Sequence, residues 1–391
     1  MADYSKRVKS ITAPPIDIIT TKVMDMRDMG RKAINLGQAV CNLPLPSKLI
    51  PELKESLSET IINSYTPDPG LMELREAVAS KYFDNFFIKL SPEDEIIITA
   101  GANQAFMEVL AVISDPGDEI IICSPYYFDH EFAIKASGCT PVISPMRERN
   151  YGFSLDIKDI ESKITPKTKA VVIVTPNNPT GAVIKFTDLM DLNKIIEKNN
   201  LYLISDETYD KFVFSPDVPS TARKLTLEEN VIVISSLSKT SGLAGMRIGY
   251  IITPASLYGE LIKIQDAMIV CAPHIAQKAA LICLKEKESW FAKRLKAIEE
   301  RKNITNEYLS KIKVFETRPV EGAFFAFPKY KIDVPSLDLA LDILDKTGVA
   351  LIHGSAFGEA GEGHLRISFG NTDIPVLKEA LERIANYFNK Y

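Results

Sequence analysis

The stretch SSLSKTSGLAGMRIGY, residues 235–250, decides the fold, because it starts where a buried strand should end. It directly follows the apolar run at residues 231–234, and it holds one lysine, Lys239, among serines and glycines. A lysine that loses solvation beside a core has a lowered pKa, and its amine becomes nucleophilic. The alternative is a surface lysine whose aliphatic stem lies along apolar residues.

Four more short apolar runs precede this stretch and alternate with longer amphipathic segments. They are residues 96–99, 119–123, 170–175 and 201–205. One of the amphipathic segments, residues 187–199, has the apolar spacing of a helix. Apolar strands that alternate with helices indicate a mostly parallel sheet with both faces covered. The sequence therefore predicts an α/β fold with a large domain around a mostly parallel, mixed sheet flanked by helices.

The rest of the chain has a different pattern. Residues 255–312 are helical throughout, and strand-like runs at 322–327, 349–352 and 365–369 alternate with helices after them. This arrangement is typical of a smaller α+β domain. The first forty residues are rich in proline and methionine, show no full periodic unit, and are interpreted as an arm that packs on the rest. We therefore predict a large domain at 46–284, and an arm and small domain formed by 1–45 and 285–391.

Composition excludes several other classes of protein. The net charge is -5, and no basic block marks a nucleic-acid partner. No secretory signal and no apolar run long enough to cross a membrane is found. The five cysteines are scattered, which indicates reduced core thiols in a cytoplasmic protein, and the four histidines lack metal-ligand spacing, so we expect no metal site.

Polar residues follow the apolar runs, and in an open parallel sheet ligands lie beyond the carboxyl ends of the strands. AGANQAF, residues 100–106, is a small-residue turn before a helix; it suits a phosphate, although glycine turns are common at such junctions. TPNNPTG, residues 175–181, has prolines that could direct Asn178 into a cleft, or it is a plain turn.

The last two strand ends carry charged side chains. DETYD, residues 206–210, places Asp206 and Tyr209 where both could reach one ligand, although the aspartate could instead cap a helix. Beyond the final run, Ser236, Ser238 and Arg247 supply donors suited to a phosphate. A phosphorylated pyridine with an aldehyde would use all four strand ends, with Lys239 forming the imine. The sequence therefore predicts pyridoxal 5'-phosphate as the cofactor.

The chain also resembles the class I/II aminotransferases, the fold-type I pyridoxal-phosphate enzymes typified by aspartate and kynurenine aminotransferases. The resemblance covers nearly the whole chain, and its motifs occur in the order expected of that family. They are NLGQ (35–38), YTPDPGLMELREA (65–77), TAGANQA (99–105), SPYYF (124–128), PNNPTG (176–181), SDETYD (205–210), SLSKTSGLAGMRIG (236–249) and HLRISFG (364–370).

The resemblance implies a role for each matching residue. Lys239 is the Schiff-base lysine and carries the proton, Asp206 pairs with the pyridinium nitrogen, and Asn178 and Tyr209 bond the ring oxygen. Tyr127 stacks on the ring, unless it is a core aromatic. The residues implied to hold the phosphate are Ser236, Ser238, Arg247 and the backbone of Ala102 and Asn103.

Two further implications concern the substrate and a second subunit. Arg366 would bind the substrate α-carboxylate, with Asn178 and the backbone of Gly37. Leu365 and Ile367 alternate with it along a strand, which leaves Arg366 on the opposite face, although a solvated strand arginine would show the same pattern. Tyr65 would reach the phosphate of the neighbouring subunit, so the enzyme would be a homodimer.

These residues together predict an aminotransferase that moves an amino group from an L-amino acid to a 2-oxo acid by a ping-pong mechanism. A carbon–sulfur β-lyase or another non-transaminating fold-type I enzyme remains an alternative, because the same lysine serves both chemistries. A non-catalytic effector-binding module is a second alternative.

The physiological donor and acceptor are not predicted. A donor with a neutral, aromatic or extended side chain is slightly favoured, because Asn103 stands where some aspartate-using relatives have a lysine. The loop at 37–43, which in this family helps to shape the pocket near the substrate side chain, also departs from the G-x-P-D-F-like ending that relatives usually have.

Overall fold

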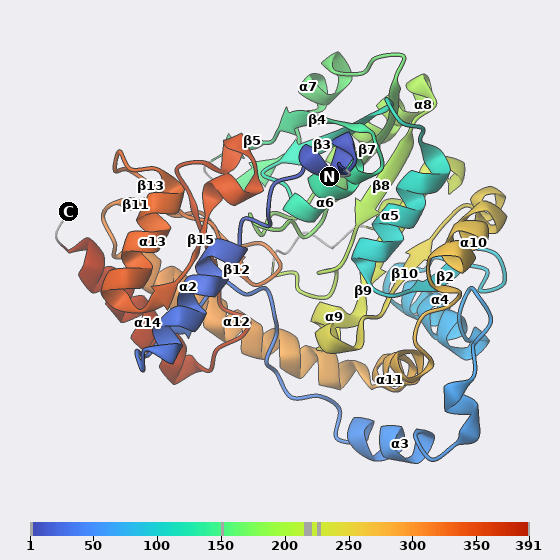
Figure 1. The fold of residues 1–391 in the computed structure, drawn as a ribbon, viewed down its shortest axis with the longest axis horizontal. Helices are drawn as coiled ribbons and strands as arrows, with labels where there is room; N and C mark the ends of the chain where they lie inside the picture. Colours follow the sequence, from blue (N-terminus) through green and yellow to red (C-terminus); the bar gives the residue numbers. More distant parts are fainter. Residues whose placement is uncertain (1–2, 150–151, 215–220, 225–227, 390–391) are drawn as a thin grey trace.

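The computed structural model describes residues 3–149, 152–214, 221–224 and 228–389. Its main feature is a seven-stranded sheet in the order β2-β10-β9-β8-β7-β3-β4 (Figure 1). The strands are β2 (Ile96–Thr99), β3 (Glu119–Ser124), β4 (Thr140–Pro145), β7 (Thr168–Val174), β8 (Tyr202–Asp206), β9 (Val231–Ser236) and β10 (Gly249–Ile252). The five predicted apolar runs coincide with β2, β3, β7, β8 and β9.

The sheet is mixed, as predicted. Strands β9, β8, β7, β3 and β4 pair in parallel, whereas β10 pairs antiparallel with both β9 and β2. Because five parallel strands lie side by side, the carboxyl ends of β7, β8 and β9 meet at one edge of the sheet. Most residues predicted to bind the cofactor lie at or just beyond these three strand ends, whereas Ala102 and Asn103 follow β2 and Tyr127 follows β3.

Helices cover both faces of the sheet. Alternate strand residues enter different hydrophobic clusters, so that Ile96 and Ile98 belong to one cluster and Ile97 to the other. One face is covered by α5 (Ala102–Ile113), α6 (Phe128–Ala136) and α10 (Ala255–Ile269). The opposite face is covered by α4 (Met72–Phe86), α8 (Phe186–Asn199) and α11 (His274–Leu284). The remaining elements of this part are α3 (Leu49–Ser56), β5 (Arg147–Arg149), β6 (Gly152–Ser154), α7 (Ile157–Ser162) and α9 (Leu237–Thr240).

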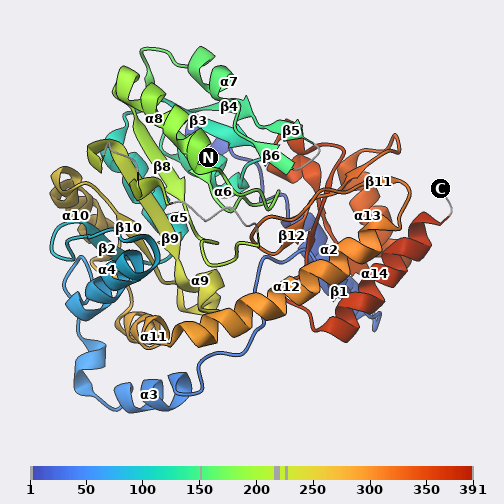
Figure 2. The same cartoon turned by 180° about the vertical axis from the view of Figure 1, so that it is seen from behind.

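The long helix α12 (Glu288–Ser310) leads from the large sheet to a second, smaller α+β unit (Figure 2). That unit contains α13 (Ser336–Thr347) and α14 (Ile374–Phe388). Its strands pair as β12-β16-β15, β11-β13 and β1-β14. They are β1 (Ile34–Asn35), β11 (Phe315–Glu316), β12 (Phe325–Ala326), β13 (Lys329–Tyr330), β14 (Val349–Ala350), β15 (Ile352–His353) and β16 (Leu365–Ser368). The predicted fold class is thus confirmed.

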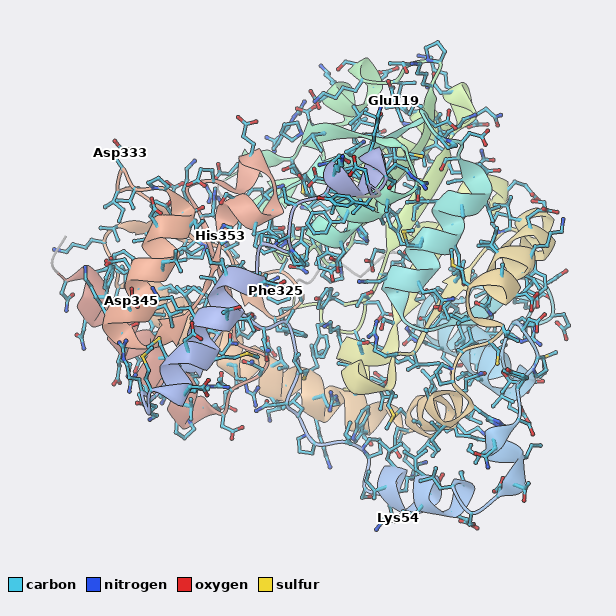
Figure 3. All side chains as sticks on the ribbon, in the orientation of Figure 1. Lys54, Glu119, Phe325, Asp333, Asp345 and His353 are labelled. Carbon is cyan, nitrogen blue, oxygen red and sulfur yellow. The ribbon has the colours of Figure 1, made fainter. Side chains whose placement is uncertain are left out.

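The N-terminal arm packs on the rest of the chain, but it is more regular than the sequence indicated. It contains α1 (Lys6–Lys9) and the twelve-residue helix α2 (Asp17–Asp28), which buries Ile19 against the core. Lys22 pairs with Asp345 at 2.6 Å, and Nε2 of His353 lies 3.2 Å from the carbonyl oxygen of Pro15. Figure 3 labels both partner residues on the small unit. No helix in the described part of the chain is long and apolar enough to cross a membrane.

Candidate active site

A cavity of about 310 Å³ opens at the carboxyl edge of the sheet, between the large sheet, the small unit and α2. This volume suits a small ligand. It is lined by every predicted site residue except Tyr65, namely Gly37, Ala102, Asn103, Tyr127, Asn178, Asp206, Tyr209, Ser236, Ser238, Lys239, Arg247 and Arg366. Residues up to 329 positions apart in sequence are therefore brought together here.

Lys239 lies in the short helix α9, directly after β9. Ser236, the last residue of β9, accepts a 3.0 Å hydrogen bond from the backbone N–H of Ser238 and thereby caps α9. The Lys239 ammonium donates to the carbonyl oxygen of Ala39. Burial, reinforced by nearby Arg366, lowers the pKa of Lys239 to about 8. The neutral, nucleophilic amine is therefore far more populated near neutral pH than in an ordinary lysine, whose pKa is 10.5.

At one end of the cavity, several hydrogen-bond donors lie close together and could bind an anion. The hydroxyls of Ser236 and Ser238 lie 2.8 Å apart, and the Arg247 guanidinium lies beside the turn before α5. At Gly101 in that turn φ is +92°, and an added Cβ would lie 2.6 Å from Nη2 of Arg247. Glycine is required there by backbone conformation and by the close approach of the guanidinium. Because α5 begins at Ala102, its first N–H groups have no partner within the helix.

Asp206 ends β8 and is held from two sides. One carboxylate oxygen accepts a 3.0 Å hydrogen bond from the N–H of Thr208, and the other lies 3.2 Å from Nε2 of His130. The His130 ring packs on Phe106 with 4.4 Å between ring centroids. Sequence reasoning considered His130 only as a metal ligand and missed this contact. Its position two residues beyond the SPYYF motif was the available signal.

The phenols of the site stay protonated at neutral pH. Burial raises the pKa of both Tyr209 and Tyr127 well above the usual range, so each remains a hydrogen-bond donor. Tyr127 donates to Asp129, and the Asn103 amide donates to the same carboxylate at 2.8 Å. Asp129 therefore fixes two residues of the cavity wall.

Arg366 is buried with 3% exposure and carries its charge into the cavity. It donates to Oδ1 of Asn178 at 2.8 Å and to the carbonyl oxygen of Gly37 at 2.6 Å. Its Nε has no hydrogen-bond partner, and no carboxylate among the described residues forms an ion pair with its guanidinium. Burial lowers the pKa of Arg366 to about 10, which still leaves it cationic. A buried cation without an anion is suited to bind a carboxylate ligand.

Other lining residues were not predicted. Helix α2 and the segment before it contribute Ile16, Ile19 and Thr20, and Val40 and Ile352 extend the apolar wall. Their sequence pattern carries no chemical signal, because apolar residues of this kind occur throughout the core. Tyr65, in contrast, is 81% exposed and does not line the cavity of its own chain.

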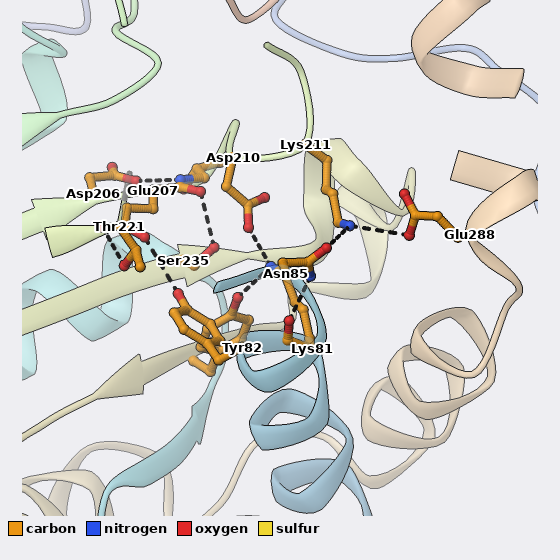
Figure 4. A network of polar contacts seen from close by, with 12 residues as sticks. Lys81, Tyr82, Asn85, Asp206, Glu207, Asp210, Lys211, Thr221, Ser235 and Glu288 are labelled. Carbon is orange, nitrogen blue, oxygen red and sulfur yellow. Dashed lines mark hydrogen bonds and ion pairs between the residues drawn. The ribbon is translucent and has the colours of Figure 1, made fainter. Parts of the chain in front are cut away.

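In the segment from Asp206 to Asp210, the side chains of Glu207 and Asp210 belong to a polar network with residues of α4 (Figure 4). Lys81 of α4 pairs with Asp210 at 2.5 Å and donates to the Tyr250 hydroxyl at 2.8 Å. Burial alone lowers the pKa of Lys81, but Asp210 outweighs it, and the net shift is upward.

Glu207 belongs to the same network. One carboxylate oxygen accepts from the Ser205 hydroxyl at 2.9 Å, the Thr221 hydroxyl at 3.0 Å and the N–H of Ala222 at 2.9 Å. Burial raises the pKa of Glu207 to about 7. The contacts of Glu207 and Asp210 therefore hold in place the segment from which Asp206 and Tyr209 line the cavity.

The donor set fits pyridoxal 5'-phosphate. A close approach of Arg247 to Gly101 and free helix N–H groups suit a phosphate, and a lysine with a lowered pKa suits an aldehyde. A mixed α/β sheet with such a site at its edge defines the pyridoxal-phosphate enzymes of fold type I. Within that class, the chain belongs to the family of class I and II aminotransferases, which it matches over residues 31–384.

Similar proteins agree with this family. The chain is 33% identical to the aspartate aminotransferase of Thermotoga maritima, covering 98% of this chain and 99% of the relative. It is 32% identical to aromatic-amino-acid aminotransferase 2 of Thermococcus litoralis, over 93% of each chain. The solved structure of an alanine aminotransferase from Pyrococcus furiosus superposes with a TM-score of 0.93 at 29% identity, covering 100% of both chains.

These findings confirm the resemblance, the fold class and the cofactor predicted from the sequence. The protein is a pyridoxal-phosphate-dependent aminotransferase that acts on an amino acid and a 2-oxo acid. The relatives are named for aspartate, aromatic amino acids and alanine. Their names therefore do not identify the donor used by this chain.

Proposed function

We propose that Lys239 is the lysine that binds the cofactor covalently and then carries the substrate proton. The observation that carries this proposal is its lowered pKa in the cavity that also holds Asp206 and Arg366. When bound, pyridoxal 5'-phosphate supplies an electron sink for the pair released at the substrate Cα. As a neutral amine, Lys239 Nζ can accept the Cα proton directly.

The other residues bind and orient. Asp206, held by His130 and the N–H of Thr208, would pair with the ring nitrogen of the cofactor. The residues that bind the remaining cofactor groups are Asn178 and Tyr209 at the ring oxygen, Tyr127 at the ring face, and Ser236, Ser238, Arg247 and the N–H groups of Ala102 and Asn103 at the phosphate.

Arg366 binds the α-carboxylate of the substrate, together with Asn178 and the backbone of Gly37. Its two hydrogen bonds to these residues and its unpartnered Nε support this role. A carboxylate fixed by a guanidinium determines which Cα bond is positioned for cleavage. The 2-oxo acid of the second half-reaction would use the same contact after the first product has left. The amino group stays on the enzyme between the two half-reactions, so the kinetics are ping-pong.

The active enzyme is a homodimer in which Tyr65 completes the phosphate site of the neighbouring subunit. Tyr65 is 81% exposed, which supports a contact outside its own chain. Other exposed apolar side chains precede Tyr65 closely in the chain: Ile50, Leu57 and Ile61. Exposed apolar residues that gather in one patch favour a protein interface.

The preferred donor has a neutral, aromatic or extended side chain. The apolar wall formed by Ile16, Ile19 and Val40 supports this choice. Asn103 supports it as well, because its amide is bound by Asp129 and supplies no positive charge for a side-chain carboxylate.

The larger domain spans residues 46–284, and residues 1–45 with 285–391 form the smaller one. The pairing of β1 with β14 supports the assignment of the arm to the smaller domain. We place the enzyme in the cytoplasm, and its five free cysteines support a reducing compartment.

The experiment that tests this function treats the holoenzyme with one amino acid at a time, without an oxo acid. Transamination predicts a single conversion of the cofactor to its pyridoxamine form and one equivalent of oxo acid. Continuous release of ammonia or thiol would instead support the β-lyase. The amino acids that convert the cofactor fastest identify the donor class, and conversion only by aspartate and glutamate would contradict the proposed preference.

A further inference from the structure

The loop at residues 37–43 supplies two backbone contacts to the active site. The carbonyl oxygen of Gly37 accepts from Arg366 at 2.6 Å, and that of Ala39 accepts from Lys239. Within this loop, Gln38 and Val40 are exposed, and none of its residues belongs to a helix or strand. Its position therefore depends on contacts made by its far end.

Three of these contacts come from Arg294 of α12. Asn42 is held separately: its Oδ1 accepts from Arg301 at 2.7 Å, and its N–H donates to the carbonyl oxygen of Gly370 at 3.1 Å.

Arg294 is 4% exposed, and its Nη1 donates to the carbonyl oxygens of Leu43 at 3.2 Å and Pro44 at 2.8 Å. Its Nη2 lies 3.6 Å from the sulfur of Cys41. The guanidinium carbon lies 4.6 Å from the centroid of the Trp290 ring, which fixes the side chain from the other side. One side chain thus joins the long helix to the end of the loop.

The charge of Arg294 is not neutralised by a carboxylate within the described residues, and its Nε has no partner. Burial lowers the pKa of Arg294, as expected for a cation removed from water. Arg301 lies about two turns further along the same face of α12. It differs from Arg294 in that its Nη2 lies 3.7 Å from a carboxylate oxygen of Asp373. Burying a cation whose partners are carbonyl groups and a thiol is costly, so it adds little net stability. Its contacts specify geometry instead.

We propose that Arg294 is a positioning residue for transamination, which fixes the loop at 37–43 and through it the carbonyl groups that hold Arg366 and Lys239. The inference rests on the proposed roles of Arg366 and Lys239. Loss of the Arg294 contacts would let the loop move away from the cavity, and the substrate carboxylate would then meet a less ordered Arg366.

The test compares Arg294→Met with Arg294→Lys and with Lys293→Met. Methionine removes the donors at similar length, lysine keeps the charge, and Lys293 is an exposed neighbour on the same helix. The first measurement is the alkylation rate of each cysteine in the holoenzyme by iodoacetamide, followed by peptide mass spectrometry. Cys123 and Cys139 are buried elsewhere and report on general unfolding. A nearby cation favours the reactive thiolate, so removing it cannot by itself accelerate the reaction of Cys41.

For Arg294→Met we expect alkylation of Cys41 to accelerate at least about tenfold while Cys123 and Cys139 stay protected, because opening is local. The KM for the amino acid should rise about tenfold or more with a smaller change in kcat, and lysine should restore part of it. An unchanged Cys41 and KM would overturn the proposal. So would equal acceleration at all three cysteines, which reports general destabilisation. If the wild type itself fails to transaminate, the proposed function fails, whatever the cysteines show.

Discussion

Nη1 of Arg366 donates a 2.8 Å hydrogen bond to Oδ1 of Asn178, although the two residues lie 188 positions apart. Arg366 belongs to β16 of the small unit, and Asn178 follows β7 of the large sheet. The contact therefore joins the two units at the point where the substrate carboxylate is proposed to bind. Any change in the relative position of the units alters that binding site directly.

Replacing Arg366 tests the carboxylate contact. We expect Arg366→Met to raise the KM for the amino acid about a hundredfold, because a buried charge pair with the substrate is lost. Steady-state kinetics with the best donor measure the effect. Arg366→Lys keeps the charge but not the two-pronged geometry, and it should recover only part of the affinity. A tenfold change in affinity corresponds to about 1.4 kcal/mol of binding free energy. A KM for Arg366→Met within twofold of the wild-type value would therefore show that Arg366 does not bind the substrate.

The pKa of Lys239 predicts how the cofactor-free protein responds to pH. Since burial lowers that pKa from 10.5 to about 8, the rate at which added pyridoxal 5'-phosphate attaches should rise with pH and level off above about pH 8. Borohydride reduction and peptide mapping at each pH measure attachment at this residue. A rate that still climbs steeply at pH 10 would indicate an ordinary lysine.

The same shift affects the stability of the cofactor-free protein. Between pH 8 and pH 10.5 the unfolded chain holds a proton on Lys239 that the folded chain has released. The unfolded state therefore binds more protons, and this residue makes the free energy of unfolding increase with pH across that window. Lys239→Met should flatten the increase in urea titrations that are run at each pH.

Asp206 and His130 should differ in how strongly they affect turnover. Asp206→Asn removes the carboxylate that is proposed to pair with the ring nitrogen, and we expect kcat to fall more than about a hundredfold while the cofactor stays bound. His130→Gln leaves the charge in place and removes only the 3.2 Å contact, so a smaller loss is expected. Absorbance of the bound cofactor and kcat, measured together, separate retention from chemistry. Near-native turnover in Asp206→Asn would contradict its role.

The site was easiest to predict from the sequence where a reactive or polar side chain stands at the end of an apolar strand. Lys239, Asp206 and Asn178 follow buried apolar strands, so parallel pairing alone brings them to one edge of the sheet. Arg366 was predicted through the family resemblance, and its strand alternation is consistent with the cavity that it faces.

Contacts that depend on packing could not be predicted. Helix α2 has only Ile19, Val23 and Met26 on its buried face, and methionine and proline elsewhere in the arm obscured that spacing. Arg294 and Lys81 resemble surface residues in the sequence, because their burial arises from partners far away along the chain. His130 likewise acquires its partner only when α6 folds over the end of β8.

Removing one partner of the buried pair between Lys81 and Asp210 should be costly, although the intact pair adds little net stability. Lys81→Met leaves the Asp210 carboxylate buried without its cation, and we expect a loss of about 3–5 kcal/mol in the free energy of unfolding. The double variant Lys81→Met/Asp210→Leu should regain most of this loss, since neither charge then remains. Lys263→Met, which breaks an exposed pair with Glu260, is the matched control and should cost under about 1 kcal/mol. Urea unfolding of the four proteins measures these differences. A Lys81→Met variant as stable as the wild type, or a double variant that recovers nothing, would contradict the prediction.

Subunit complementation tests whether Tyr65 acts in the neighbouring site. In a mixed dimer of Tyr65→Ala and Lys239→Ala chains, one site lacks both side chains, whereas the other has Lys239 from one chain and Tyr65 from the other. Refolding the two inactive variants together in equal amounts should therefore restore about a quarter of the wild-type activity, because half of the dimers are mixed and each has one intact site. If Tyr65 acted within its own chain, each site of the mixed dimer would lack one residue, and no activity would return. A monomer in sedimentation experiments would contradict the shared site altogether.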